Sequence, residues 1–321
     1  MSVLVTGGAG YIGSHVVRLL QQRGDDVVVV DDLTNGVRER IGDAVLVPAD
    51  VAADETLPVL ESALREHAVD SIIHFAAKKQ VGESVQRPAF YWKQNVGGLA
   101  NVLTAAENCG VGRLVFSSSA ATYGAPDVDL VREDGGNSPI NPYGETKLVG
   151  EWMARAAGRA WGLRSANLRY FNVAGAGWDD LSDTAVLNLV PIVFSALDAG
   201  RAPVVFGADY PTPDGTCIRD YVHVLDLAEA HLAALDGLDR GLEHDVFNVG
   251  TGTGSSVLEV LAEIRTATGS TVEPELRERR PGDPPKLVAD VSRIEQELGW
   301  TAKKSLSDIV SSAWRGWRSR G

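Results

Sequence analysis

Residues 6–13, TGGAGYIG, restrict the possible folds of this 321-residue chain more than any other segment. They follow a β-rich run at 2–7 and open a helical pattern at 11–23. Glycines at this spacing allow a tight strand-to-helix turn and a close approach of the backbone to a pyrophosphate. The helix N terminus then supplies N–H donors and its positive dipole end. The segment therefore predicts a dinucleotide-binding turn formed by Gly7, Gly10, Tyr11, Ile12 and Gly13.

The first half of the chain alternates β-rich runs with amphipathic helical patterns. The expected strands are 2–7, 26–31, 44–50, 71–76, 113–119 and 165–171. The expected helices are 11–23, 54–67, 84–109 and 143–161. Apolar strands that alternate with helices form parallel βαβ units covered on both faces. The pattern predicts an α/β fold with a Rossmann-type, doubly wound parallel sheet.

The pattern changes after residue 172. Loops rich in Gly, Pro and Asp separate helical patterns near 184–200, 225–239, 256–268 and 305–318, and 275–283 has the composition of a charged, turn-prone loop. The run HDVFNVG at 244–250 is typical of one more strand of the main sheet. We therefore expect an NAD-binding domain at 1–172, to which 225–250 returns, and a smaller C-terminal α/β substrate-binding domain at 173–321.

The second expected strand ends in two carboxylates, Asp31 and Asp32, about twenty residues after the glycine turn. A carboxylate at this position binds the 2′-hydroxyl of the adenosine ribose of NAD. The 2′-phosphate of NADP would meet two negative charges there and no arginine. The pair therefore favours NAD over NADP.

The composition limits the partners and the compartment. With 43 acidic and 30 basic residues, the formal net charge is −13, which argues against nucleic acid or an anionic membrane as the main partner. The two cysteines, Cys109 and Cys217, give no disulfide framework and fit a reducing compartment. Neither they nor the six histidines have metal-ligand spacing, so we expect no metal. The start MSVLVTGG leaves no room for a signal peptide, and no apolar run is long enough to span a membrane, so we expect a cytoplasmic protein.

NPYGETK at 141–147 places Tyr143 and Lys147 four residues apart, on one face of a helix. The ordinary pKa of tyrosine is near 10, so a tyrosine that acts as a base near pH 7 needs a pKa roughly 3 units lower, worth ~4 kcal/mol. One opposite charge lowers a pKa by about 1–3 units. Lys147 alone is therefore borderline, whereas Lys147 together with the positive nicotinamide of oxidised NAD suffices. Ser119, in SSSAATYG after the fifth expected strand, lies where such folds bind their ligands and is the third candidate catalytic residue.

Taken together, these motifs are similar to the extended branch of the short-chain dehydrogenase/reductase family. Within that family, nearly the whole chain resembles the UDP-glucose 4-epimerases. The segments that carry this resemblance are HFAAKKQVGESV (74–85), LRYFNVAGA (168–176), FGADYPTPDGTCIRDYVHV (206–224) and RRPGD (279–283). The resemblance implies NAD-dependent inversion at C4 of a UDP-hexose through a transient 4-keto sugar. Tyr143, as phenolate, would take the proton of the 4-hydroxyl directly or through Ser119, and Lys147 would contact the nicotinamide ribose and lower the pKa of Tyr143.

The resemblance also implies binding residues. The glycine turn, Asp31, Asp32, Tyr143 and Lys147 are part of the NAD site that the resemblance implies. The further NAD-binding residues that it implies are Asn35, Asp50, Val51, Phe75, Ala76, Ala77, Lys79, Asn95 and Ser117. For the UDP-sugar, it implies Lys79, Ser119, Tyr143, Asn172, Asn188, Leu189, Val204, Phe206, Arg219, Arg280, Asp283 and Leu287. The two arginines are the forked, permanently charged donors that a pyrophosphate requires on an acidic protein. The family also implies a homodimer built from two helices per subunit, 84–109 and 143–161.

Two positions leave the substrate open. Ala121 stands where the family usually has a threonine, and Leu287 stands where a bulky or a small residue excludes or admits N-acetylated sugars. One alternative is therefore another nucleotide-sugar enzyme, such as a UDP-N-acetylhexosamine 4-epimerase or a 4,6-dehydratase. A dehydratase needs a further acid or base beside the serine, and residues 120–122 contain no carboxylate. The other alternative is a non-catalytic NAD sensor, which should have lost Tyr143, Lys147 or Ser119.

Overall fold

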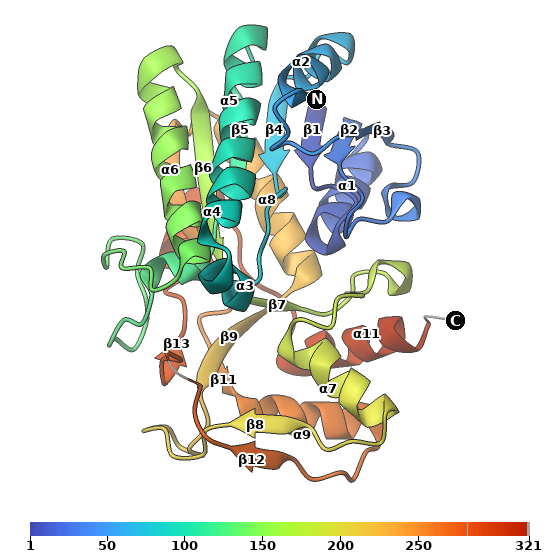
Figure 1. The fold of residues 1–321 in the computed structure, drawn as a ribbon, viewed down its shortest axis with the longest axis vertical. Helices are drawn as coiled ribbons and strands as arrows, with labels where there is room; N and C mark the ends of the chain where they lie inside the picture. Colours follow the sequence, from blue (N-terminus) through green and yellow to red (C-terminus); the bar gives the residue numbers. More distant parts are fainter. Residues whose placement is uncertain (281, 320–321) are drawn as a thin grey trace.

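A seven-stranded parallel sheet forms the upper part of the molecule (Figure 1). The structure, a computed structural model, describes residues 1–280 and 282–319. From one edge of the sheet to the other, the strands are β10 (His244–Val249), β6 (Arg164–Tyr170), β5 (Arg113–Ser117), β4 (Ser71–His74), β1 (Ser2–Thr6), β2 (Asp26–Asp31) and β3 (Val45–Pro48). Every neighbouring pair is parallel. The predicted Rossmann-type α/β fold is confirmed.

Helices cover both faces of this sheet because successive strand residues point to opposite sides. In β1, Val3 and Val5 pack with α1 (Tyr11–Arg23) and α8 (Val224–Asp239) in one buried cluster. Leu4 lies on the other face, in a cluster with α2 (Thr56–Glu66), α5 (Gly98–Cys109) and α6 (Pro142–Trp161). The two clusters form the core that holds the carboxyl ends of the strands in place.

The expected helix at 84–109 is wrong as a single element. It divides into α3 (Val81–Gln86), α4 (Pro88–Tyr91), the π-helical turn η2 (Trp92–Gly97) and α5. Proline disfavours the α conformation in the residue before it, and Arg87 accordingly has φ −132° and ψ 56°. Helix α3 lies below α4, at the level where the upper and lower parts meet, and packs against α4 and α6 (Figure 1).

The lower part contains short strands and most of the remaining helices (Figure 1). One sheet joins β7 (Asn172–Ala174), β9 (Ile218–His223), β11 (Gly254–Ser256) and β13 (Lys286–Leu287), and a second pairs β8 (Val204–Phe206) with β12 (Glu275–Arg277). The helices of the lower part are α7 (Leu189–Asp198), α9 (Val257–Thr268) and α11 (Leu306–Arg318). Helix α10 (Ser292–Leu298) packs instead against the main sheet, beside β10 and α8. Three short 3-10 turns, η1 (Arg38–Ile41), η3 (Ala120–Tyr123) and η4 (Asp179–Leu181), complete the described elements.

Two predictions about the second half had different outcomes. The strand expected at 244–250 is confirmed as β10, which pairs with β6 at the edge of the main sheet. The loop expected at 275–283 is wrong in part, since its first three residues form β12. All three residues of β12 are exposed, and charged residues are common on exposed edge strands because they discourage aggregation.

Candidate active site

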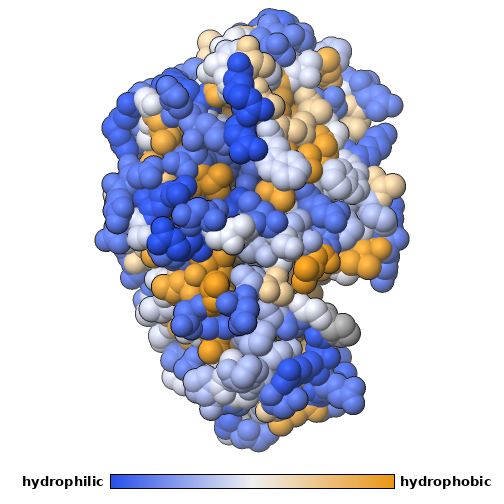
Figure 2. Space-filling model, turned by 90° about the vertical axis from the view of Figure 1, so that its left-hand side faces the viewer, coloured by the Kyte–Doolittle hydropathy of each residue, from blue (hydrophilic) through white to orange (hydrophobic). Residues whose placement is uncertain are grey.

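A cavity of about 970 Å³ lies at the carboxyl ends of the sheet strands, where the upper part meets the lower part. Figure 2 shows that the molecular outline is indented between these two parts. Most of the predicted site residues line this cavity: Gly7, Gly10, Tyr11, Ile12, Gly13, Asp31, Asp32, Asn35, Asp50, Val51, Phe75, Ala76, Ala77, Lys79, Ser119, Tyr143, Lys147, Asn172, Asn188, Leu189, Arg219, Arg280, Asp283 and Leu287. Residues from distant parts of the sequence thus share one space.

Four predicted residues, Asn95, Ser117, Val204 and Phe206, are not in the cavity wall. The Asn95 side chain is buried and fixes the neighbouring loop, since it accepts the Lys78 N–H at 2.8 Å and donates to the Lys78 carbonyl at 3.0 Å. Ser117 accepts a hydrogen bond from Lys147 Nζ on its carbonyl oxygen at 2.8 Å. Asn95 and Ser117 therefore lie outside the wall and hydrogen-bond to two wall residues, Lys78 and Lys147.

The glycine turn between β1 and α1 has no room for side chains. Gly7 has a φ of +70°, and a Cβ on it would lie 2.8 Å from the Ala76 nitrogen. A Cβ on Gly13 would overlap the Gly7 carbonyl oxygen. Helix α1 has no side-chain cap at Gly10, so the N–H groups of its first turn are left to a ligand in the cavity.

The two carboxylates at the end of β2 differ in their surroundings. Asp31 is buried and accepts the N–H groups of Ala9 and Leu33 at 3.0 and 2.9 Å. Burial raises the pKa of Asp31, and these two hydrogen bonds act in the opposite direction. Asp32 lies 3.7 Å from Lys78 Nζ, so a lysine stands beside the two expected carboxylates. Lys78, which also lines the cavity, was missed by the sequence analysis, although it lies only four residues after the end of β4.

The position at which helix α6 begins places Tyr143 in the cavity wall. The Asn141 side chain caps the helix by accepting the Gly144 N–H at 2.9 Å, and Pro142 occupies the first helical position. Tyr143 thus lies in the first turn and Lys147 one turn later. Lys147 Nζ is 5.9 Å from the centre of the Tyr143 ring.

Burial dominates the electrostatics of this pair. It raises the pKa of Tyr143 above the ordinary value; Tyr170 raises it further, and a hydrogen bond with Ser119 lowers it. Burial lowers the pKa of Lys147 to about 8, while the carboxylate of Glu151 opposes this decrease. Lys147 thus stays largely protonated at pH 7, but the lysine alone does not overcome the effect of burial on Tyr143. Additional positive charge is needed to form the phenolate near neutral pH.

Ser119 connects Tyr143 to the end of β5. It caps the turn η3, with its Oγ accepting the Ala121 N–H at 3.1 Å, and 9% of its surface is exposed. Ala121 also lines the cavity, so a methyl group stands in the wall at the position where the sequence analysis noted the family's usual threonine.

The opposite end of the cavity carries the predicted arginines. Arg219 on β9 donates to the Asp283 carboxylate at 3.0 Å. The Arg280 guanidinium lies 3.9 Å from the centre of the Phe206 ring, so Phe206 supports the wall through Arg280. Val204 lies two residues earlier on β8 and pairs with Glu275, away from the wall. Pro281, in the RRPGD motif, is outside the described residues.

The comparison with protein families matches residues 3–250 to the NAD dependent epimerase/dehydratase family. This chain belongs to that family. The UDP-glucose 4-epimerase of Azospirillum brasilense is 48% identical over 317 residues, which cover 97% of this chain and 90% of that protein. A crystal structure of UDP-glucose 4-epimerase from Stenotrophomonas maltophila with bound NAD and formylated UDP-arabinopyranose has a TM-score of 0.94 and 41% identity, covering 99% and 98% of the two chains. The Brucella ovis enzyme in complex with NAD has a TM-score of 0.93 and 40% identity, covering 97% of each chain.

One further wall residue of this epimerase/dehydratase chain has no sequence signal. Arg40, in the turn η1, is buried and donates to the Ser182 carbonyl at 2.7 Å, so it joins the segment after β2 to the lower part. It stands in a run of alternating charges, GVRERI, that is typical of a solvated surface. Among the described residues, no helix is long and apolar enough to cross a membrane, and no three His, Cys, Asp or Glu residues are grouped to hold a metal ion.

Proposed function

We propose that this chain interconverts UDP-glucose and UDP-galactose by inverting C4 of the sugar, with NAD as a retained cofactor. The observation that carries the proposal is that Tyr143, Lys147 and Ser119 share one cavity with the glycine turn and with Arg219 and Arg280. The relatives support it, since they are UDP-glucose 4-epimerases that match nearly the full length.

The residues of the upper part fit NAD. Side chains are excluded from the glycine turn, and the uncapped start of α1 offers N–H donors to a pyrophosphate. Asp31 and Asp32 would hold the adenosine ribose, and Lys147 the nicotinamide ribose. When bound, NAD accepts a hydride from C4 and returns it to the other face of the 4-keto sugar. We propose residues 1–172 with 225–250 as the NAD-binding domain, and 173–321 as the domain that binds the UDP-sugar.

Tyr143 would act as the base. It would accept the proton of the sugar 4-hydroxyl, directly or through Ser119, and return it to O4 after the sugar has turned over. Because burial raises the pKa of Tyr143, the proton transfer requires positive charge from Lys147 and from the oxidised nicotinamide together. Tyr143 therefore works as a base only beside the oxidised cofactor.

The lower part would hold the nucleotide. Arg219 and Arg280 supply two positive charges to a pyrophosphate in a chain of net charge −13. Asn172, Asn188, Leu189 and Asp283 complete the proposed contacts, with Lys79 and Leu287 toward the sugar. A 4,6-dehydratase remains the second candidate, and it is less well supported because no carboxylate follows Ser119.

Product analysis tests the proposal. UDP-galactose and UDP-N-acetylgalactosamine are supplied separately, without added NAD, and C4 inversion is followed by NMR. We expect UDP-galactose to convert, and Tyr143→Phe to lose at least ~100-fold in kcat while it retains NAD. Tyr210→Phe is the matched control, because the Tyr210 hydroxyl is buried, has no hydrogen-bond partner and lies outside the cavity wall. Conversion of neither sugar by protein that contains NAD would refute the function, and a 4-keto-6-deoxy product would indicate a dehydratase.

We also propose that two copies associate through α5 and α6, and that the protein is cytoplasmic. Trp152 on α6 is 50% exposed and Trp92 just before α5 is 37% exposed, so both of these helical segments offer aromatic surface to a second copy. Figure 2 looks onto the side of the molecule that carries α6, where hydrophobic side chains lie among polar ones. Light scattering of the wild type and of Trp152→Glu tests the dimer. A monomeric wild type would refute it.

A further inference from the structure

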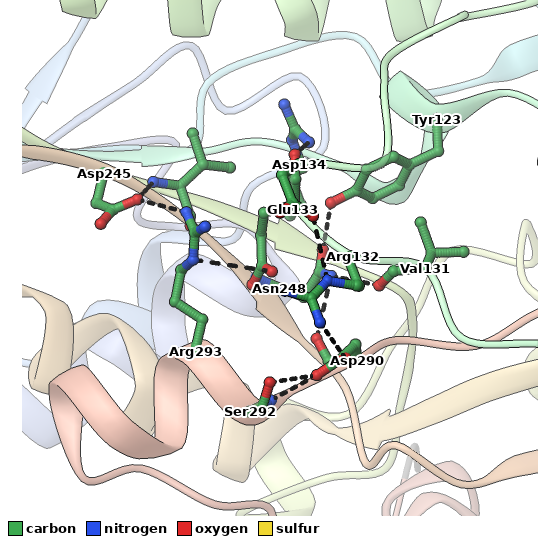
Figure 3. Close-up of polar contacts among 12 residues, drawn as sticks. Tyr123, Val131, Arg132, Glu133, Asp134, Asp245, Asn248, Asp290, Ser292 and Arg293 are labelled. Atoms are coloured by element: carbon green, nitrogen blue, oxygen red, sulfur yellow. Dashed lines mark hydrogen bonds and ion pairs between the residues drawn. The ribbon is translucent and has the colours of Figure 1, made fainter.

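The end of β10 meets three other segments of the chain at one buried asparagine (Figure 3). Asn248 is fully buried, and its Oδ1 accepts the Tyr123 hydroxyl at 2.6 Å. Its Nδ2 donates to the carbonyls of Val131 at 2.8 Å and Asp290 at 3.1 Å. Its backbone N–H donates to Glu133 at 2.8 Å. The amide thus uses its oxygen and both of its hydrogens to join segments that are far apart in the sequence.

Two of these segments also form the wall of the cavity. Tyr123 ends the turn η3, which begins directly after Ser119. Asp290 follows Leu287 by three residues. Ala120, Tyr123, Val131, Phe171 and Ala289 form one small buried cluster, and Leu287 packs against it. Ala120, Phe171 and Leu287 also line the cavity, so this part of the wall packs directly on the cluster. Asn248 is hydrogen-bonded to two members of the cluster, Tyr123 and Val131.

The segment after Leu287 has little freedom to shift. Val131 donates its N–H to the Val288 carbonyl and accepts the Asp290 N–H, each at 2.8 Å. On the other side, the Asp220 carboxylate accepts the Ala289 N–H at 3.2 Å. Asp220 directly follows Arg219 on β9. The position of Leu287 relative to Ser119 therefore depends on contacts that converge at the end of β10.

We propose that Asn248 is a positioning residue that sets the distance between the Ser119 turn and the segment of Leu287, and with it the width of the sugar pocket. The proposal rests on the epimerase function proposed above. Replacing Asn248 by alanine removes the acceptor of the Tyr123 hydroxyl and the side-chain donor to the Asp290 carbonyl, and it leaves the Val131 carbonyl with the Asp290 N–H alone. Buried polar groups that lose a partner favour a shift of their segments toward new partners. Small displacements of catalytic groups have large effects on rate.

The test compares Asn248→Ala with Asn167→Ala in protein that contains NAD. Asn167 is also a fully buried asparagine of the main sheet and donates to one carbonyl, that of Asp245, but it is not in the cavity wall. The measurements are kcat with UDP-galactose and the dissociation constants of UDP and UDP-N-acetylgalactosamine. We expect Asn248→Ala to lower kcat at least tenfold and to change the ratio of the two dissociation constants at least fivefold. Asn167→Ala should leave both values within threefold of wild type.

Tyr123→Phe is the second variant, since it removes one hydroxyl and keeps the ring in the cluster. It cuts the link from Asn248 to the Ser119 turn but leaves the links to Val131 and Asp290. We expect kcat to fall at least fivefold and the ratio of dissociation constants to change at least twofold, because one side of the sugar pocket loses its link to Asn248. Tyr123→Phe also provides the answer if Asn248→Ala does not fold.

Changes smaller than these in Asn248→Ala and Tyr123→Phe, or equal changes in Asn167→Ala, would overturn the proposal. The ratio of dissociation constants is measured without turnover. It therefore reports on Asn248 even if the wild type does not invert C4, a result that would refute the proposed function instead.

Discussion

Replacing Lys147 by methionine should remove a pH dependence of stability that the buried lysine creates. The Lys147 side chain is 3% exposed and its ammonium group has one hydrogen-bond acceptor, the Ser117 carbonyl. Burial disfavours the charged form, so folding works against protonation of this amine. Methionine has a similar length and no charge, and it therefore keeps the packing while it removes the titration.

The pKa change sets the size and the direction of the effect. Burial lowers the pKa of Lys147 from 10.5 to about 8, which corresponds to about 3 kcal/mol between the two protonation states. Because the folded pKa is below the unfolded one, the unfolded chain binds the proton more tightly between these values. Stability therefore rises as the pH rises from about 8 toward 10.5. Between pH 7 and 9.5, this linkage adds about 2 kcal/mol to the free energy of unfolding of the wild type.

Urea unfolding at pH 7 and pH 9.5 measures the effect, in protein stripped of bound nucleotide because a ligand stabilises the folded state by mass action. The increase between the two pH values should be about 2 kcal/mol larger for the wild type than for Lys147→Met. Lys93→Met is the control, because the Lys93 side chain is 62% exposed and should show the wild-type increase. An equal increase in all three proteins would mean that Lys147 titrates as in water, and the argument from burial would fail.

Three other substitutions test the cofactor turn, the nucleotide contacts and a buried ion pair outside the cavity wall. Gly13→Ala should abolish NAD retention, measured by absorbance after denaturation, since its Cβ would overlap the Gly7 carbonyl. Arg219→Lys keeps the charge but loses the fork, so UDP should bind about tenfold more weakly by calorimetry while NAD is retained. Glu151→Gln leaves the guanidinium of Arg169, 2.6 Å from the carboxylate in wild type, without its buried counter-ion. Unfolding in urea should show a loss of about 3–5 kcal/mol.

Local patterns were sufficient to predict the parts of the site that depend on neighbouring residues. The glycine turn, the cap of α6 and the four-residue spacing of Tyr143 and Lys147 are determined within a few residues of sequence. The carboxyl ends of parallel strands meet at one edge of a sheet, and this rule predicts that Asp31 and Ser119 lie at the same edge. The main sheet was predictable for the same reason, because each strand has its own apolar run.

Contacts between distant segments were not predictable. Asn95 was assigned to the cavity wall, but the π-helical turn directs its side chain to the backbone of Lys78. Arg40 has the appearance of a surface residue until the Ser182 carbonyl, more than a hundred residues later, becomes its acceptor. Asn248 stands inside a plain strand pattern, and only the folded chain shows that three loops converge on it. These side chains have roles set by tertiary packing, which residue periodicity does not encode.

The place of β10 at the edge of the main sheet also bears on how the chain is made. A nascent chain that ends at Tyr170 has six strands, an unpaired β6 edge and a sheet face that still lacks α8. At a synthesis rate of about 5–20 residues per second, this state lasts on the order of ten seconds before β10 emerges. During that interval the open edge can pair with another chain. A fragment cut at residue 172 would stay in this condition permanently, so it should aggregate, whereas in the full chain β10 pairs with β6 and α8 covers the sheet face.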